Sequence, residues 1–357
     1  MSDPNDLYVI IMAGGRGTRF WPRSRRSMPK QCLSLDGGRT LIQKTVDRVR
    51  PLAPAERVLV ITAADMADAI AAQLPELPAE NILVEPEGRN TAPCVGWGVV
   101  EVRRRAGGEA VIAVLPADHL IRDEDGLRGD LAAAAAAASA TGALVTLGLT
   151  PTRPETGFGY LELGASVGDW GGRTLREVAR FVEKPDVVTA EAYLAGGNHL
   201  WNAGMFVFTV GAAVAAFEAH LPDMWSALSR LEQAPEALPA IYPTLEKISF
   251  DFGIMERAPR VITCPSSPGW SDVGSWTAAG EHLPASPLGR ALVRAGIAID
   301  AGDCVVHAPE KVVALVGVRD LVIVDAGDAL LVCRADQAQR VRDVIDALGA
   351  SGLDDLL

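Results

Sequence analysis

Short apolar runs alternate with segments of helical spacing through the first 150 residues of the chain. The apolar runs at Tyr8–Ala13, Arg57–Thr62 and Ala110–Leu115 have the length of buried strands. Between them, Thr40–Val49 and Ala64–Leu74 gather their apolar residues on one side of a helix. Strands that alternate with helices form βαβ units, in which the strands run parallel. The pattern therefore predicts an α/β fold with a doubly wound, mostly parallel sheet and helices on both faces.

The composition and hydrophobic pattern of the sequence change after residue 155. Over residues 156–209, glycines and aromatic residues interrupt β-rich pieces, which indicates an insertion that carries a substrate pocket. The stretch 283–288 is rich in proline and is a candidate linker. Short Val, Leu and Ile runs separated by Gly and Asp turns follow it, and an amphipathic helix is expected at 335–348. We therefore predict a large domain over residues 1–283 and a small β-rich C-terminal domain over residues 284–357 that ends in a helix.

The chain is acidic, with a formal net charge of −12. Such a surface argues against non-specific binding to nucleic acid, although a small anion responds to the local field. The five cysteines are scattered, with no CxxC pair and no histidine at metal-ligand spacing, so we expect reduced thiols. No apolar stretch is long enough to span a bilayer, and Met1–Tyr8 lacks the basic region of a secretory signal. We expect a cytoplasmic protein that binds neither nucleic acid nor membrane.

Residues 13–30 form the most informative segment. It reads Ala-Gly-Gly-Arg-Gly-Thr-Arg-Phe-Trp-Pro-Arg-Ser-Arg-Arg-Ser-Met-Pro-Lys and directly follows the first apolar run. Glycines after a strand let backbone N–H groups approach a ligand closely, and phosphate is the usual ligand. A Walker A loop is excluded because no Gly-Lys-Ser/Thr is present. A dinucleotide fingerprint is excluded because Phe20 stands where its third glycine should be.

Six cations and no acid lie between Arg16 and Lys30 of this segment. In an otherwise acidic chain, this clustering favours a polyphosphate ligand, whose roughly four negative charges accept charge-assisted hydrogen bonds. The alternative is a solvated basic loop after a tight turn. The position of the glycines beside the strand end disfavours that alternative.

The segment resembles the signature of the nucleotidyltransferases that act on sugar 1-phosphates, a strand followed by GGxGTRxxPxxxxxPK. Gly14 to Lys30 matches it closely, apart from a small difference in spacing. The resemblance implies a doubly wound, Rossmann-like core and a catalytic role for the large domain. It also implies that Lys30 and either Arg16 or Arg19, with Arg16 preferred, hold a triphosphate. Further loop residues expected to bind substrate are Ala13, Gly14, Gly15, Gly17, Thr18 and Arg19.

Two aspartates are candidate ligands of a magnesium ion. Asp118 follows the apolar run that ends at Leu115, and an acid at the carboxyl end of a parallel strand lies where such sheets bind ligands. Asp272 stands in Trp-Ser-Asp-Val-Gly-Ser-Trp. Either residue alone is also typical of a cap on the turn or helix that follows. By the resemblance both coordinate the catalytic Mg²⁺, and the neighbouring His119 is a positional or nucleotide contact rather than a general base.

Three blocks between residues 156 and 206 match the sugar site of the same family in the right order. Each is weak alone, because glycines and aromatic residues also pack turns and because Glu183–Lys184 is typical of an exposed ion pair. Together, the resemblance implies that Gly157 and Asn202 contact the sugar, that Glu183 binds its hydroxyls and that Lys184 holds its phosphate as a third catalytic residue.

The block Glu-Pro-Glu-Gly-Arg-Asn-Thr-Ala-Pro over residues 85–93 discriminates most between substrates. It looks like the version found in mannose-1-phosphate guanylyltransferases rather than in uridylyl- or thymidylyltransferases. The residues expected to bind the nucleotide are Glu85, Arg89, Asn90, Thr91 and Ala92. Thr91 has the alternative role of a helix N-cap, and Asn90 that of a turn residue.

The resemblance therefore implies transfer of GMP from GTP to α-D-mannose 1-phosphate with Mg²⁺, by direct attack on the α-phosphorus, and it suggests a homodimer. Two alternatives stay open. One is the same chemistry on another sugar 1-phosphate or nucleotide, and the other is a regulator that binds a nucleotide sugar without making it. The presence of both aspartates argues against the regulator, because a protein that only binds has no need of metal ligands.

Overall fold

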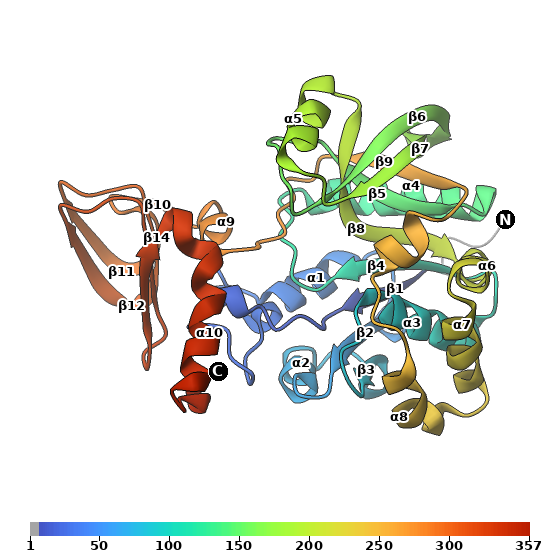
Figure 1. The fold of residues 1–357 in the computed structure, drawn as a ribbon, viewed down its shortest axis with the longest axis horizontal. Coiled ribbons are helices and arrows are strands. Elements are labelled where there is room, and N and C mark those ends of the chain that lie inside the picture. Colours follow the sequence, from blue (N-terminus) through green and yellow to red (C-terminus); the bar gives the residue numbers. More distant parts are fainter. Residues whose placement is uncertain (1–6) are drawn as a thin grey trace.

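The computed structural model describes residues 7–357 (Figure 1). Residues 1–6 lie outside this description. The expectation of no secretory signal rests mostly on these residues and therefore stays a prediction. One sheet of nine strands lies within residues 7–266, and a second sheet of five strands lies within residues 285–334.

The first half of the large sheet is parallel, as the alternating pattern predicts. Its strands are β1 (Leu7–Met12), β2 (Val58–Ala63), β3 (Ile82–Glu85) and β4 (Val111–Pro116). They lie in the order β3-β2-β1-β4 and all pair in parallel. The helices between and after them are α1 (Leu41–Val49), α2 (Ala67–Gln73), α3 (Thr91–Ala106) and α4 (Glu124–Thr141). α1 begins one residue after the predicted start, because Thr40 is its N-cap and forms a reciprocal capping box with Gln43.

The second half of the large sheet mixes strand directions. Its strands are β5 (Leu144–Leu149), β6 (Gly159–Trp170), β7 (Arg173–Glu183), β8 (His199–Thr209) and β9 (Val261–Ser266). β8 lies between β4 and β5 and runs antiparallel to both, whereas β5 and β9 are parallel. β6 and β7 form a long hairpin, which is the β-rich insertion that the sequence predicts. The full order is β3-β2-β1-β4-β8-β5-β9-β7-β6.

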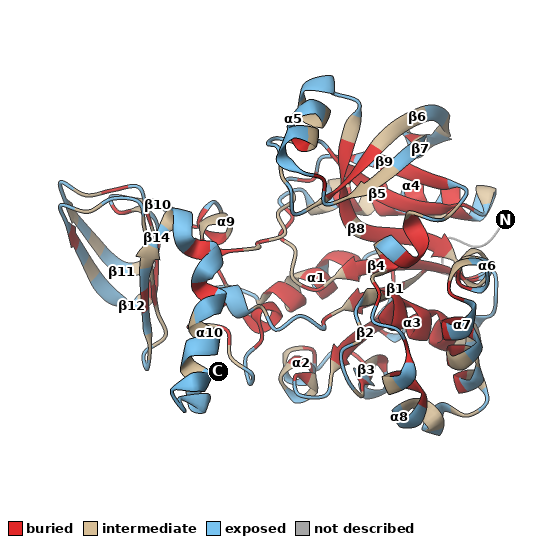
Figure 2. Ribbon diagram, viewed as in Figure 1, coloured by how far each residue is buried: buried red, intermediate tan, exposed pale blue. Residues whose placement is uncertain are grey.

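Two clusters of buried apolar residues line the two faces of this sheet. Figure 2 shows that buried residues are concentrated in its strands and in the helices packed against it. The remaining helices of this part are α5 (Val187–Gly196), α6 (Val210–His220), α7 (Pro222–Leu228) and α8 (Leu238–Ile241). Val9 and Ile11 of β1 pack with α1, α2 and α4, while Ile10 packs with α3, α6, α7 and α8 on the other face. Each such buried aliphatic side chain contributes about 1.5–3 kcal/mol. The doubly wound α/β fold is therefore confirmed.

The C-terminal sheet consists of β10 (Ala285–Ser286), β11 (Gly289–Ile299), β12 (Cys304–Val316), β13 (Leu321–Asp325) and β14 (Leu330–Arg334). β11, β12 and β13 pair in parallel, and the short edge strands β10 and β14 pair antiparallel. The proline-rich stretch predicted as a linker contains β10, so it is tied to the sheet by hydrogen bonds. α10 (Val341–Ala350) provides the expected final helix. The domain boundary between residues 283 and 284 stays a prediction.

A separate apolar cluster joins the glycine-rich loop to the C-terminal sheet. Phe20 and Trp21 of the loop pack with Trp276 of α9 (Trp276–Gly280) and with Val322 and Val324 of β13. The ring centroids of Phe20 and Trp276 are 4.9 Å apart. The loop after β1 is therefore held by both parts of the chain.

Candidate functional site

Three segments that are distant in the sequence meet at one edge of the large sheet. β1 and β4 are parallel neighbours, and their last residues, Met12 and Pro116, are paired. The glycine-rich loop and the segment that carries the first candidate aspartate therefore start side by side. The segment 267–275 is tied to the latter by two backbone hydrogen bonds of 2.9 Å between Leu120 and Ser271. Carboxyl ends of parallel strands are the usual ligand sites of such sheets.

Lys30 lies at the centre of this meeting point. Its Nζ donates to Asp118 Oδ2 at 2.7 Å and to the backbone carbonyl of Asp272 at 2.9 Å. The residue is only 5% exposed. An ammonium group has three donors, so one remains for a ligand. The glycine-rich loop, the first aspartate and the second are thus brought together around a single buried cation.

Gly17 allows the lysine to pass beneath the loop. A Cβ atom on this residue would lie 2.1 Å from Lys30 Cβ, and its φ of 67° falls in the left-handed region that favours glycine. The other loop residues assigned to substrate directly follow β1 at the same sheet edge: Ala13, Gly14, Gly15 and Thr18. The loop sequence is therefore constrained by the position of the lysine as well as by a ligand.

The two candidate metal ligands have opposite electrostatic surroundings. Burial alone would raise the pKa of Asp118, but the charge and the hydrogen bond of Lys30, together with His119 and a backbone hydrogen bond, hold that pKa below its ordinary value. Burial raises the pKa of Asp272, and repulsion from Asp118 adds to this effect although Lys30 opposes it. A divalent cation would relieve this repulsion, and carboxylate oxygens are the ligands that Mg²⁺ prefers. The two aspartates therefore fit a magnesium ion.

Within residues 7–357, no cluster of three or more His, Cys, Asp and Glu side chains is suited to a metal. Magnesium commonly takes only one or two carboxylates and completes its shell with substrate phosphates and water. The two aspartates are consistent with that mode of binding.

His119 packs beside Trp270. Its Nδ1 accepts a hydrogen bond of 3.0 Å from the indole Nε1 of Trp270, and burial lowers its pKa to about 4. A neutral imidazole that accepts at Nδ1 carries its proton on Nε2. This arrangement offers a ligand a donor rather than a base, and contact with the nucleotide stays a prediction.

The arginines of the loop have different partners. Arg16 is exposed and pairs with Asp65 at 2.6 Å. Arg19 donates to the carbonyl of Gly274 at 2.8 Å and to Gln339 Oε1 at 3.2 Å. An exposed ion pair exchanges its carboxylate for phosphate at little cost, whereas Arg19 holds two parts of the chain together. Of the two alternatives for the triphosphate, the geometry favours Arg16.

The tail of the chain also binds the loop. The carbonyl of Leu356 accepts hydrogen bonds from Trp21 Nε1 at 3.0 Å and from Arg25 Nη1 at 2.6 Å. Arg25 also pairs with Asp328 at 2.9 Å. Sequence analysis missed these contacts because no motif marks the tail residues. Part of the cationic charge of the loop therefore has a structural role.

Glu85 lies beneath the glycine-rich loop at the end of β3. Its carboxylate accepts a hydrogen bond from the hydroxyl of Tyr242, and burial raises its pKa. A Cβ atom on Gly14 would lie 3.5 Å from Glu85 Oε2. Ala92 is buried at the start of α3 nearby in the chain. The block assigned to the nucleotide is therefore in contact with the loop assigned to its phosphates.

Asn90, rather than Thr91, caps α3. Its side chain accepts from the backbone N–H of Thr91 at 2.8 Å, and its φ is 70°. Thr91 Oγ1 accepts instead from the backbone N–H of Phe250 at 2.8 Å. Arg89 donates to the carbonyl of Leu245 at 3.0 Å. The N-cap alternative is thus wrong for Thr91, and the nucleotide contacts of all three residues stay predictions.

Asn202 of β8 is fixed at both side-chain atoms. Its Oδ1 accepts from Thr146 Oγ1 at 2.9 Å, and its Nδ2 donates to Asp251 Oδ1 at 2.6 Å. Burial raises the pKa of Asp251 to about 6, and the nearby charge of Glu183 adds to that shift. Asn202, Asp251 and Glu183 therefore form one polar group. Sequence analysis missed Asp251, because it lies in an irregular helical turn with no motif around it.

Glu183 and Lys184 follow each other at the end of β7 and form an ion pair of 2.5 Å. The Lys184 side chain is 62% exposed, and its φ is 50°. Non-glycine residues with positive φ are concentrated at functional sites. The backbone N–H of Gly157 donates to Glu155 Oε1 at 3.0 Å. The loop that contains Gly157 contacts the ion pair through its backbone, because the N–H of Lys184 donates to the carbonyl of Phe158.

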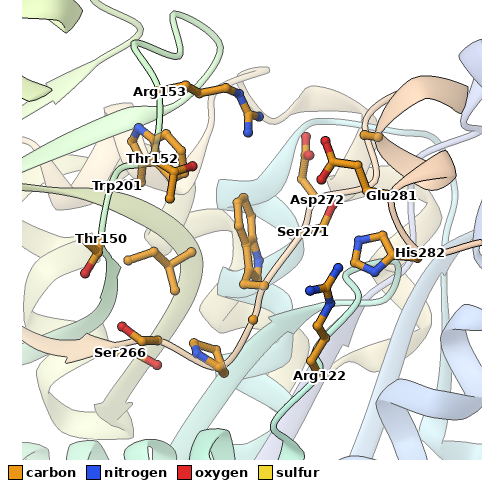
Figure 3. A pocket seen from close by; sticks show the side chains of 16 residues that line it. Arg122, Thr150, Thr152, Arg153, Trp201, Ser266, Ser271, Asp272, Glu281 and His282 are labelled. Carbon is orange, nitrogen blue, oxygen red and sulfur yellow. The ribbon is translucent and has the colours of Figure 1, made fainter. Parts of the chain in front are cut away.

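A cavity of about 360 Å³ opens beside Asp272 (Figure 3). Its walls come from the loop after β5, the segment after β9 and the end of α9. The rings of Trp201 and Trp270 each lie 5.3 Å from Phe158 and form an aromatic wall. Arg153, which the sequence analysis did not single out, also lines this cavity.

The chain is similar to known proteins in sequence and fold. A family model described as nucleotidyl transferase matches residues 8–284. The chain belongs to the nucleotidyl transferase family. A second model, described as a MannoseP isomerase/GMP-like beta-helix domain, matches residues 295–348. The nucleotidyl transferase fold and the enzyme class expected from the glycine-rich loop are therefore confirmed.

Relatives of this nucleotidyl transferase extend over nearly its whole length. A mannose-1-phosphate guanylyltransferase of Escherichia coli (strain K12) is 36% identical over 97% of this chain and 74% of that protein. The xanthan biosynthesis protein XanB of Xanthomonas campestris pv. campestris (strain B100) is 36% identical over 98% of this chain and 74% of that protein. A crystal structure named as mannose-1-phosphate geranyltransferase from Thermus thermophilus is 39% identical, with a TM-score of 0.87 over 96% of this chain and 99% of that chain.

None of the helices in residues 7–357 combines the length and apolarity needed to cross a bilayer. All five cysteines are free.

Proposed function

We propose that this nucleotidyl transferase moves GMP from GTP to α-D-mannose 1-phosphate and releases pyrophosphate. The observation that carries the proposal is the meeting of the glycine-rich loop, Asp118 and Asp272 around Lys30. Two carboxylates and a buried cation at a sheet edge are suited to a polyphosphate and its divalent ion. The names of the relatives from E. coli and T. thermophilus support the choice of sugar phosphate, and the former also supports the nucleotide.

The reaction asks the protein for positioning and charge stabilisation rather than for a covalent nucleophile. A phosphate oxygen of mannose 1-phosphate attacks the α-phosphorus of GTP. The bond from the α-phosphorus to the bridging oxygen breaks, and that oxygen leaves with pyrophosphate. Lys184 holds the attacking phosphate, since its exposed ammonium has donors beyond the one that Glu183 accepts.

Lys30 and Arg16 act on the nucleotide side. Lys30 has one donor free of Asp118 and the Asp272 carbonyl, and it stabilises charge on the α-phosphate and the leaving pyrophosphate. Arg16 exchanges Asp65 for a phosphate of GTP. Asp118 and Asp272 hold Mg²⁺, which neutralises charge on the reacting phosphates when it is bound.

The remaining assigned residues recognise the two substrates. Glu85, Arg89 and Asn90 select the base beside the loop, and Asn202 and Glu183 bind the sugar hydroxyls. We further propose that the reaction takes place in the cytoplasm, because five free cysteines are typical of a reducing compartment.

A substrate panel tests the proposal. Pyrophosphate release is measured with GTP, ATP, UTP and dTTP against mannose, glucose and N-acetylglucosamine 1-phosphates, each with Mg²⁺ and with added chelator. We expect the highest kcat/KM for GTP with mannose 1-phosphate and no turnover with chelator. A higher kcat/KM for another pair reassigns the substrates. No release with any pair would indicate a binding protein and overturn the proposal.

A further inference from the structure

Arg153 lies on the wall of the cavity beside Asp272 and is in contact with two aromatic rings. It lies in the loop between β5 and β6, and its guanidinium carbon is 5.4 Å from the Trp201 ring centroid and 5.9 Å from that of Phe158. A guanidinium over two aromatic faces gains cation–π attraction and loses little mobility on binding. Its side chain is nevertheless 53% exposed, so it is accessible to a ligand.

Part of the guanidinium is already used within the loop. Nε donates to Glu155 Oε2 at 3.1 Å, and Nη2 lies 3.1 Å from the same oxygen. The other oxygen of Glu155 accepts from the backbone N–H of Gly157 at 3.0 Å. Within the described part of the chain, no acceptor takes up Nη1. Glu155 therefore orients Arg153 through Nε and Nη2, and Nη1 remains available to a ligand.

The guanidinium of Arg153 lies on the same side of the cavity as the candidate metal ligand Asp272. Arg153 and Asp272 line the same cavity, and Figure 3 shows the guanidinium extending from the β5–β6 loop toward the side of the cavity where Asp272 stands. A cation on that side of the cavity is suited to a phosphate group that lies beside Asp272.

Two neighbours connect Arg153 to the candidate sugar site. Glu155, with which Arg153 pairs, also accepts a hydrogen bond from the backbone N–H of Gly157. Phe158, whose ring lies near the guanidinium, accepts at its carbonyl a hydrogen bond of 3.2 Å from the backbone N–H of Lys184. Gly157 and Lys184 are assigned to the sugar 1-phosphate, so Arg153 is best placed to reach that substrate.

We propose that Arg153 binds the phosphate of the sugar 1-phosphate substrate and thereby selects a phosphorylated sugar. The inference rests on the function proposed above. The planar guanidinium fork matches two phosphate oxygens, whereas a lysine at the same position offers only a point charge.

The test compares Arg153→Met, Arg153→Lys and the control Arg334→Met. Arg334 forms the same kind of ion pair two residues apart, with Asp336, at the end of β14 and away from the site. Steady-state rates give KM for mannose 1-phosphate and for GTP separately. Calorimetry gives the Kd of Mg²⁺–GTP without sugar phosphate, and of mannose 1-phosphate and free mannose without nucleotide. Thermal unfolding checks the fold.

In Arg153→Met we expect KM for mannose 1-phosphate to rise about tenfold to a hundredfold, as for the loss of a hydrogen bond to a charged group. Arg153→Lys should show a smaller rise, and KM and Kd for GTP should stay within about twofold in all three variants. An unchanged KM for mannose 1-phosphate, or an equal rise for GTP, overturns the assignment of Arg153.

Failure of the proposed function has a different signature. The wild-type protein would then release no pyrophosphate, and calorimetry alone would decide the role of Arg153. Tighter binding of mannose 1-phosphate than of mannose, reduced by Arg153→Met, supports the contact. Equal binding of the two sugars, or no effect of the substitution, overturns it.

Discussion

Replacing Lys30 with methionine is the most direct perturbation of the site. The variant keeps the volume of the stem and removes the ammonium that bonds Asp118 and the Asp272 carbonyl. Deleting one partner of a buried ion pair costs about 3–5 kcal/mol, because the other charge is left uncompensated. The Asp118 side chain is 34% exposed, so water solvates it in part and we expect a loss of about 2–3 kcal/mol. In a chain of 357 residues, this loss lowers the Tm by roughly 3–4 °C.

Turnover should fall far more than stability does. Removing a donor aimed at developing charge lowers kcat by about 10²–10³-fold. The two readouts are thermal unfolding without ligands and pyrophosphate release with saturating substrates. The control is Lys44→Met, which removes a more exposed ion pair with Asp36 and should cost less than about 1 kcal/mol.

A double variant separates the two effects. In Lys30→Met with Asp118→Asn, neither charge of the pair remains, so about 1–2 kcal/mol of stability should return relative to Lys30→Met alone while turnover stays low. The reasoning is refuted by a Lys30→Met protein that unfolds at the wild-type temperature. It is equally refuted if the double variant loses the sum of the two single effects.

Three further predictions follow from individual residues. Gly17→Ala should lower the Tm, because the left-handed backbone costs a residue with a Cβ about 1–2 kcal/mol. It should also raise KM for GTP, because the added methyl displaces Lys30. An unchanged KM for GTP would show that the loop does not bind the nucleotide. Asp272→Asn should leave the Tm unchanged or raised without Mg²⁺, since burial disfavours its charge, while kcat falls about a hundredfold or more; normal Mg²⁺-dependent turnover would exclude it as a ligand. The pKa of Asp251 is raised from 3.8 to about 6, so the folded state binds its proton more tightly and this group makes stability fall as pH rises from about 4 to 6. Asp251→Asn, which keeps an acceptor for Asn202, should remove that fall in denaturation curves at pH 4 and 7, and an identical pH dependence in the variant would contradict the shift.

The parallel half of the sheet was predictable because its signals are local. The bounds of β1, β2 and β4 agree to within one residue with the apolar runs identified from the sequence. α1 starts one residue after its predicted position because Thr40 caps it. The direction of β8 was not predictable. Its apolar pattern is the same whichever way it runs between β4 and β5, and the choice depends on chain connections that a local pattern does not encode.

The candidate site divides in the same way. Lys30, Asp118 and Asp272 stood in recognisable motifs, and the structure brings them together. Asp251 and Arg153 escaped sequence analysis because they act through distant partners, Asn202 and the Trp201 ring. A polar residue in an irregular segment has no periodicity to mark it.

The bond between Trp21 and Leu356 spans 335 positions of the chain. During synthesis the N-terminal part emerges and folds first, so β1 and its neighbouring strands take shape while the partner of Trp21 is still untranslated. The glycine-rich loop then lacks this hydrogen bond until Leu356 has been synthesised. The parallel strands can therefore pair before the tail holds the loop in place.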